Sequence, residues 1–476
     1  MWILLLSSLP ALATAPDAPV LVSPADAAAG TGLAPPLTVQ VSDPDGDPLS
    51  VTYSLRRYVA PGEDFTIIAM PDTQHYACGC GGGSTETFGA QTAWIAEQQP
   101  LLNVAYVSQL GDCTEHGDTY EDEWWVADEA FAAFDEDRST WPLPEGGLAY
   151  GVAAGNHDQT PIGSADGTTI YYNQYFGVDR FSTKYWYGGY YGTNYDNHYD
   201  LFDAGGTSFV VIYFEYDTSP NADVLAWADD VLTTYSDRHA IIVSHFLLDS
   251  AGEHSTLGEQ AYATLAHHEA LFLFLSGHIH DEANRTDRTG PRNVHSRLSD
   301  YQSRDNGGDG WLRIMLFSPA SGSFEVQTYS PTLDTYEDDV DSAMTLDWDP
   351  NPAPWSALGT VFLGAGEASL EPETLEVNTT YEWTVTVSDG VESVTGGPWT
   401  FTTGDGTVVD SAEESQPPLD SDSPVVVDSE PVDEPIEGDP ADTGGLIDDP
   451  KGGGGCGTGG FAALGLVLLG ARRRRR

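Results

Sequence analysis

The sequence predicts an α/β (α+β) protein with an additional all-β part. Five short apolar runs, rich in β-branched residues and bounded by Gly, Pro or polar residues, predict buried strands. Helical patterns lie between several of these runs, and such alternation is typical of helices packed on a sheet. Two further stretches with short β patterns flank this region. In chain order the five runs are FTIIAM, NVAYVSQL, LAYGVAAG, HAIIVSHF and LFLFLSG.

A short polar motif closes or follows each run. Open α/β sheets bind ligands in the crevice at the carboxyl ends of their strands. One such motif would be weak evidence, but five of them at predicted strand ends, carrying Asp, Asn, Gln and His, predict a metal site. The motifs are Pro-Asp-Thr-Gln (71–74), Gly-Asp (111–112), Gly-Asn-His-Asp (155–158), His245 and Gly-His-Ile-His (277–280).

Each of these residues also has a purely structural interpretation. Asp72 and Asp112 could form turns, the usual task of Asp beside Gly or Pro. His278 and His280 alternate about Ile279, so both rings face the same side of an extended segment. Two core histidines would each need a buried hydrogen-bond partner, and a shared metal centre is the simpler account.

At these motifs the chain resembles the calcineurin-like metallophosphoesterases, over roughly Phe65 to Tyr336. It is most similar to a bacterial subgroup with D-T-Q as first motif, which shares G-H-x-H-x-E-A-x-R (277–285) and D-Y-Q (300–302). The resemblance implies a sandwich of two mixed β-sheets flanked by helices, and a pair of divalent ions (Mn, Fe, Zn or Mg) bridged by a carboxylate. The implied bridge is Asp112, with Asp72, Gln74 and His280 on one metal and Asn156, His245 and His278 on the other.

The same resemblance implies a reaction. His157 would bind no metal and would act on the substrate as general acid or hydrogen-bond donor, with Asp158 orienting its imidazole. A hydroxide bridging the metals would attack a small phosphoester, and either a phosphatase or a phosphodiesterase fits. The alternative is a catalytically degenerate surface binding or adhesion protein that uses the fold as a scaffold.

Gln74 departs from the commonest first motif of that family, D-x-H. An amide oxygen is a weaker and harder donor than imidazole, which favours manganese or magnesium over zinc at the first metal. Gln74 could instead support the site without touching the metal.

Other residues near the motifs leave alternatives open. Arg285 could form a surface ion pair or contact phosphate, and His116 could line the pocket. His267 and His268 lie on a helical pattern and are predicted to be solvated or capping residues. The Tyr- and Gly-rich residues 171–202 predict a long loop at the rim of the pocket, whose tyrosines and His198 could set specificity.

Composition limits the partners. The formal charge is −56, from 74 acidic and 18 basic residues. Such a surface repels polyanions, so a nucleic-acid polymer is not expected as substrate. A disulfide from Cys113 to Cys78 or Cys80 is plausible because both loops approach the metal site. Three free thiols are the competing interpretation, and a Cys78–Cys80 bridge is less favoured because it would be strained.

The ends of the chain predict export. Residues 1–15 have the short apolar core and Ala-x-Ala end of a signal peptide. Residues 405–454 form an acidic stretch predicted to be a disordered linker. Residues 455–476, with Cys456, an apolar stretch and five terminal arginines, resemble a C-terminal sorting tag of myxobacterial surface proteins. A secreted or outer-envelope bacterial protein, held at the membrane or cell surface by this segment, is expected.

The flanking β stretches, residues 16–60 and 352–404, each resemble half of a fibronectin type III or immunoglobulin-like sandwich. One split sandwich with a phosphoesterase domain at 62–348 inserted in a loop is expected. Two independent β modules are the alternative. The cluster Asp43, Asp45 and Asp47 could bind calcium, although a Pro/Gly/Asp turn is the default.

Overall fold

The computed structural model describes residues 14–165, 167–289 and 292–406. The predicted sorting tag, almost all of the signal peptide and almost all of the acidic linker lie outside these residues. Within the described part of the chain, none of the helices combines the length and apolar character needed to cross a membrane.

The central region contains a first mixed sheet in the order β17-β16-β15-β5-β6-β7, with β18 also paired to β16. Strands β5, β6 and β7 are parallel neighbours, and β15 runs antiparallel to β5. The bounds are β5 (Phe65–Met70), β6 (Val104–Gln109), β7 (Tyr150–Val152), β15 (Leu312–Ser318), β16 (Ser323–Ser330), β17 (Thr335–Glu337) and β18 (Met344–Asp347).

A second mixed sheet has the order β13-β14-β12-β11-β10-β9-β8. Its four inner strands β14, β12, β11 and β10 are parallel, and antiparallel partners flank them on both sides. The bounds are β8 (Tyr187–Tyr190), β9 (His198–Ala204), β10 (Thr207–Phe214), β11 (His239–Ser244), β12 (Leu271–Ser276), β13 (Glu282–Thr289) and β14 (Arg292–Ser299).

Aromatic side chains pack the two sheets against each other. Phe65 of β5 stacks on Phe317 of β15 and meets the edge of Phe209 of β10, with ring centroids 4.9 and 5.5 Å apart. All three rings are fully buried and belong to the largest apolar cluster. The predicted pair of mixed sheets flanked by helices is therefore present.

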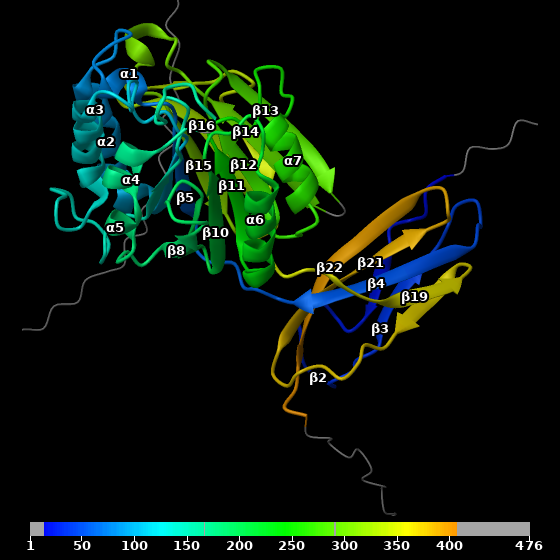
Figure 1. The fold of residues 1–476 in the computed structure, drawn as a ribbon. Helices are drawn as coiled ribbons and strands as arrows, with labels where there is room; N and C mark the ends of the chain where they lie inside the picture. Colours follow the sequence, from blue (N-terminus) through cyan, green and yellow to red (C-terminus); the bar gives the residue numbers. More distant parts are fainter. Residues whose placement is uncertain (1–13, 166, 290–291, 407–476) are drawn as a thin grey trace, which may run out of the picture. The chain divides into compact units, whose positions relative to one another are not determined.

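Helices cover both outer faces (Figure 1). Apolar faces of α2 and α3 join the core of the first sheet through Phe88, Ile95 and Trp124, while α6 and α7 pack on β10, β11 and β12. Side-chain caps start the latter two helices, because Asn221 accepts from the Asp223 N–H and Ser255 from the Gly258 N–H. The helices are α1 (Gln74–Ala77), α2 (Thr85–Leu102), α3 (Glu121–Phe131), η1 (Ala132–Phe134), α4 (Ile170–Phe176), α5 (Val178–Phe181), α6 (Ala222–Thr234), α7 (Thr256–Leu265) and η2 (Asp305–Gly307).

Strands before and after the central region pair with one another. In one sheet β4 lies between β19 and β21, followed by β22 and β2, and in the other β3 lies between β1 and β20. Alternate residues of β4 are buried against Trp383 and its neighbours in a separate core. The two flanking segments thus share both sheets, while the fibronectin or immunoglobulin type stays a prediction. The strands are β1 (Val20–Ser23), β2 (Ala28–Thr31), β3 (Leu37–Val41), β4 (Leu49–Arg57), β19 (Ser356–Leu363), β20 (Gly366–Leu370), β21 (Thr380–Ser388) and β22 (Ser393–Thr403).

The Tyr-rich segment is not the long loop that its glycine content predicts. It forms α4, α5, β8 and β9, and many of its aromatic side chains enter the core. The Tyr172 hydroxyl donates to the Val152 carbonyl at 2.7 Å, and the Trp186 indole N–H donates to the Tyr150 carbonyl at 2.9 Å. His198 is fully buried between the rings of Tyr195 and Tyr213, so it does not line a pocket rim.

Neither of the two main interpretations of the cysteines, a disulfide from Cys113 or three free thiols, is correct. Cys78 bonds to Cys80, with 5.2 Å between their Cα atoms, and Cys113 is a buried free thiol. Left-handed glycines on both sides of Cys80 fold the loop back on itself. Two cysteines two residues apart can then meet, which an extended C-x-C segment would not allow.

Candidate metal centre

The five predicted motifs all lie at the carboxyl ends of strands. Asp72 follows β5, Asp112 follows β6 and Asn156 follows β7, three parallel neighbours of the first sheet. His245 and His278 follow β11 and β12, parallel neighbours of the second sheet. The two sheets therefore bring their polar strand ends to one place, as the sequence predicts.

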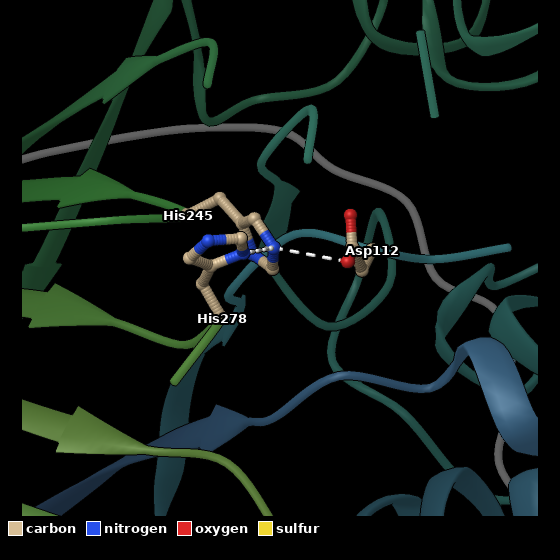
Figure 2. Close-up of side chains that lie close together, drawn as sticks. All are labelled: Asp112, His245 and His278. Atoms are coloured by element: carbon tan, nitrogen blue, oxygen red, sulfur yellow. Dashed lines mark hydrogen bonds and ion pairs between the residues drawn. The ribbon is translucent and has the colours of Figure 1, made fainter. Parts of the chain in front are cut away.

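Asp112, His245 and His278 form the innermost group. Their ligand atoms lie within 4.8 Å of one another, and Figure 2 shows the three side chains pointing toward a common point. The His245 Nε2 atom is 3.0 Å from Asp112 Oδ2 and 3.2 Å from His278 Nδ1. Both histidine rings also lie against the ring of Tyr216, an aromatic neighbour that the sequence motifs did not reveal.

This group needs positive charge between its members, which a proton on His245 or a metal ion can supply. The Leu110 carbonyl lies 3.0 Å from His245 Nδ1 and must accept its hydrogen, so a neutral ring presents a lone pair at Nε2. That lone pair would face the Asp112 carboxylate. Burial opposes protonation, but Asp112 and Asp72 outweigh it and raise the pKa of His245 to about 10. Burial and the neighbouring His245 lower the pKa of His278 to about 4, so His278 offers a lone pair.

Three further oxygens at the site have no hydrogen-bond partner among the described residues. They are Asp72 Oδ2, Gln74 Oε1 and Asn156 Oδ1, and all three atoms are buried. An unpartnered buried acceptor costs about 1–3 kcal/mol unless something compensates it. Carboxylate, amide and imidazole donors together suit divalent ions, so the residues present fit the metal centre that the resemblance implies.

The carboxylates respond differently to the same burial. For Asp72, burial and then the negative charge of Asp300 raise the pKa well above its ordinary range. For Asp112, burial acts in the same direction, but the neighbouring His245 outweighs it and lowers the pKa. Asp112 is therefore the carboxylate that stays ionised most readily.

Unusual backbone conformations aim these side chains. Asp112 and His278 have φ angles of 47° and 73°, in the left-handed region that non-glycine residues seldom occupy. Gly155 and Gly277 let the chain approach closely, because a Cβ atom there would collide with the carboxylates of Asp112 and Asp72 respectively.

His157 lies beside the innermost group. Its backbone N–H donates to Asp112 Oδ1 at 2.8 Å, and its Nδ1 lies 2.8 Å from the Glu115 carbonyl. The carbonyl must receive the Nδ1 hydrogen, which leaves Nε2 free for other contacts. Burial disfavours the charged ring, but the Asp112 carboxylate, the Glu115 carbonyl and the nearby acidic side chains together outweigh this effect and raise the pKa of His157.

Asp158 does not orient the His157 imidazole as expected. Its carboxylate accepts the backbone N–H groups of Gly155, Cys113 and Thr114, and also the Thr114 hydroxyl, at 2.9–3.1 Å. It therefore fixes the loop that carries Asp112, and the Glu115 carbonyl orients the imidazole. Burial and then Asp112 raise the pKa of Asp158 to about 6.

Gln74 and His280 meet at Gln302. The Gln74 amide nitrogen donates to Gln302 Oε1, and Gln302 Nε2 lies 2.8 Å from His280 Nε2. The His280 side chain is 53% exposed and lies outside the innermost group. Its role as a ligand stays a prediction. Asp300 and Gln302 belong to the D-Y-Q motif, but neither was among the predicted metal ligands.

Other candidates have ordinary structural partners. His116 contacts Glu123 at 2.9 Å, and Arg285 pairs with Asp287 and Glu253, so Arg285 forms the surface ion pair. His267 and His268 follow α7 and face Asp229. The Asp43 carboxylate accepts the N–H groups of Asp45 and Asp47, as in the predicted turn.

Comparison with known proteins gives limited information. No protein-family model matches the sequence. The chain is similar to an uncharacterized Bacillus subtilis (strain 168) protein, YvnB, with 31% identity over an alignment of 377 residues that covers 72% of this chain and 28% of YvnB. The chain therefore spans less than a third of the length of that relative.

Two solved structures show distant similarity. A dimetal phosphatase from Danio rerio aligns with a TM-score of 0.37 and 12% identity, covering 61% of this chain and all of the other. A conserved uncharacterized protein from Streptococcus pneumoniae TIGR4, described as a predicted phosphoesterase, aligns with a TM-score of 0.26 and 11% identity, over 60% and 98%.

Proposed function

We propose that this protein is a phosphoester hydrolase that depends on two divalent metal ions. One observation carries the proposal: buried carboxylate, amide and imidazole donors converge at the strand ends, and three of their oxygen atoms have no hydrogen-bond partner in the part of the chain that the structure describes. The proposed ligands are Asp72, Gln74, Asp112, Asn156, His245, His278 and His280, with Asp112 shared by both ions.

Bound divalent ions would supply positive charge for the phosphoryl oxygens and lower the pKa of a water molecule to about 7. The protein's own part is to hold the donors in place. The Leu110 carbonyl fixes the ring of His245, and Asp158 fixes the loop of Asp112. The amide oxygens of Gln74 and Asn156 favour harder ions such as manganese or magnesium.

His157 is proposed to act on the leaving group. The Glu115 carbonyl holds its Nδ1 hydrogen, so a proton at Nε2 can be donated outward. The raised pKa of His157 keeps that proton on the ring at higher pH than for an ordinary histidine. General acid catalysis of this kind is worth about 10²–10⁴-fold in rate.

The substrate is proposed to be a small phosphoester, since the strong negative charge of the chain disfavours nucleic-acid polymers. Export and attachment to a bacterial surface are proposed on the signal-like residues 1–15, the acidic stretch 405–454 and the Arg-ended residues 455–476. The paired flanking strands are proposed to form one fibronectin- or immunoglobulin-like sandwich beside the catalytic region.

The test is hydrolysis of p-nitrophenyl phosphate and bis-p-nitrophenyl phosphate by the full chain. We expect turnover with added manganese, loss of turnover with a chelator, and recovery when manganese is restored. Asp112→Asn, which keeps the shape of the side chain, should be inactive under the same conditions. A protein loaded with two metal ions but inert on both compounds and on a broad phosphoester panel would favour the binding scaffold instead.

A further inference from the structure

We propose that Gln302 is a positioning residue that turns the amide oxygen of Gln74 toward the first metal ion. This inference rests on the proposed function, and it assigns a task to the D-Y-Q motif. It also gives a physical reason why a glutamine can serve at position 74.

The orientation of the Gln302 side chain follows from Asp300. The Gln302 backbone N–H donates to Asp300 Oδ1 at 2.9 Å, and its side-chain Nε2 donates to Asp300 Oδ2 at 3.3 Å. An ionised carboxylate can only accept hydrogen bonds. The amide nitrogen of Gln302 must therefore face Asp300, and its oxygen must face the other way.

The orientation of Gln74 follows from Gln302. Because Gln302 Oε1 is an acceptor, the Gln74 group that contacts it must be the amide nitrogen. The two ends of an amide have nearly the same shape, so hydrogen bonds decide which end points where. The Gln74 oxygen then points away from Gln302, and it is the buried atom without a partner.

Further contacts hold Gln302 in place. Its carbonyl oxygen is 3.1 Å from His75 Nδ1, and its side chain is 5% exposed. Gln302 Nε2 also lies 2.8 Å from His280 Nε2, so the same amide contacts two predicted ligands of the first metal. Asp300 therefore orients Gln302, and Gln302 orients Gln74.

Removing the acceptor at position 302 should let the Gln74 amide rotate. An amide nitrogen carries two hydrogens and cannot bind a cation, so only one of the two orientations supports the metal. Groups that orient metal ligands typically contribute about 10–100-fold to metal affinity. We expect a loss in this range at the first metal, and little change at the second.

The experiment is a manganese titration of metal-free protein, read by bound metal rather than by activity. Gln302→Met keeps the length of the side chain but loses the acceptor, and should weaken one of two sites by about 10–100-fold. Gln91→Met, at a buried glutamine that donates to the Trp311 carbonyl, is the matched control and should bind like wild type.

A double-mutant cycle with Gln74→His tests whether Gln302 acts by orienting the Gln74 amide or by supporting the structure around the site. An imidazole at position 74 has no amide to orient, so Gln302→Met should then cost less than about threefold, because the two effects are coupled. The role of Gln302 would be overturned by equal losses of affinity in both backgrounds, or by wild-type affinity in Gln302→Met. In either case, binding of two manganese ions by the wild-type protein would leave the proposed function intact. Fewer than two manganese ions on wild type would overturn both. If Gln302→Met does not fold, Gln302→Asn replaces it in the titration. Its shorter side chain withdraws the acceptor from Gln74, so the same loss of manganese affinity is expected.

Discussion

Asp200 should make the stability of the protein depend on pH between about 4 and 8. This carboxyl of β9 is fully buried and accepts the Tyr106 hydroxyl at 2.6 Å. Tyr106 in turn contacts Tyr213, whose hydroxyl donates to Ser108 at 2.8 Å. This chain of hydrogen bonds links β6 of the first sheet to β9 and β10 of the second.

Burial raises the pKa of Asp200 to about 8 in the folded protein, against about 3.9 in an unfolded chain. The folded state therefore binds the proton more tightly. Its stabilising effect is complete below pH 4, falls as pH rises, and is lost above pH 8. Over that window the free energy of unfolding should decrease by about 1.4 kcal/mol per pH unit, or roughly 3 kcal/mol from pH 5 to pH 7.

Asp200→Asn removes this dependence, because an amide keeps the shape but does not titrate. The assay is urea unfolding of wild type and variant at pH 5, 6 and 7. Other groups titrate in both proteins, so the difference between the two free energies isolates Asp200. That difference should shift in favour of the variant by roughly 3 kcal/mol from pH 5 to pH 7. A difference that does not change with pH would refute the reasoning.

Three further predictions concern the metal centre. Asp112→Asn should lower metal content well below two equivalents, because one carboxylate serves both ions; retention of two equivalents in metal analysis would remove Asp112 as the bridge. His157→Ala should keep its metal while turnover falls about 10²–10⁴-fold, and a loss of metal would instead identify His157 as a ligand. Gln74→His should raise the ratio of zinc to manganese affinity, since imidazole suits zinc better than an amide oxygen does. An unchanged ratio in titrations with both ions would exclude Gln74 from metal contact.

Much of the central fold could be predicted from local sequence. The run FTIIAM is β5 and HAIIVS is β11, because short runs dominated by apolar and β-branched residues are typical of strands buried on both faces. Helices do lie between these runs, as predicted, and α6, which Asn221 caps, is one of them. The meeting of the polar strand ends could also be predicted, because the carboxyl ends of parallel strands lie at one edge of a sheet.

What the sequence missed depends on contacts between distant residues. Glycine content predicted a loop at 171–202, yet tertiary hydrogen bonds to Val152 and Tyr150 hold its aromatic side chains in the core. Asp158 directly follows His157 in the sequence, and its carboxylate was expected to orient the His157 imidazole. Their side chains instead point to different partners, because the backbone N–H groups of the Asp112 loop take up the whole carboxylate.

The electrostatics of the site favour a ligand-binding role over a stabilising one. For Asp72, Asp158 and Asp300, burial alone raises the pKa, and a second buried carboxylate raises it further. Acidic groups gathered in this way destabilise the fold unless positive charge joins them. Histidines supply part of that charge, but burial and then the neighbouring His245 lower the pKa of His278, so His278 contributes little of it. Divalent cations would offset the repulsion among these carboxylates, which supports the proposed metal centre.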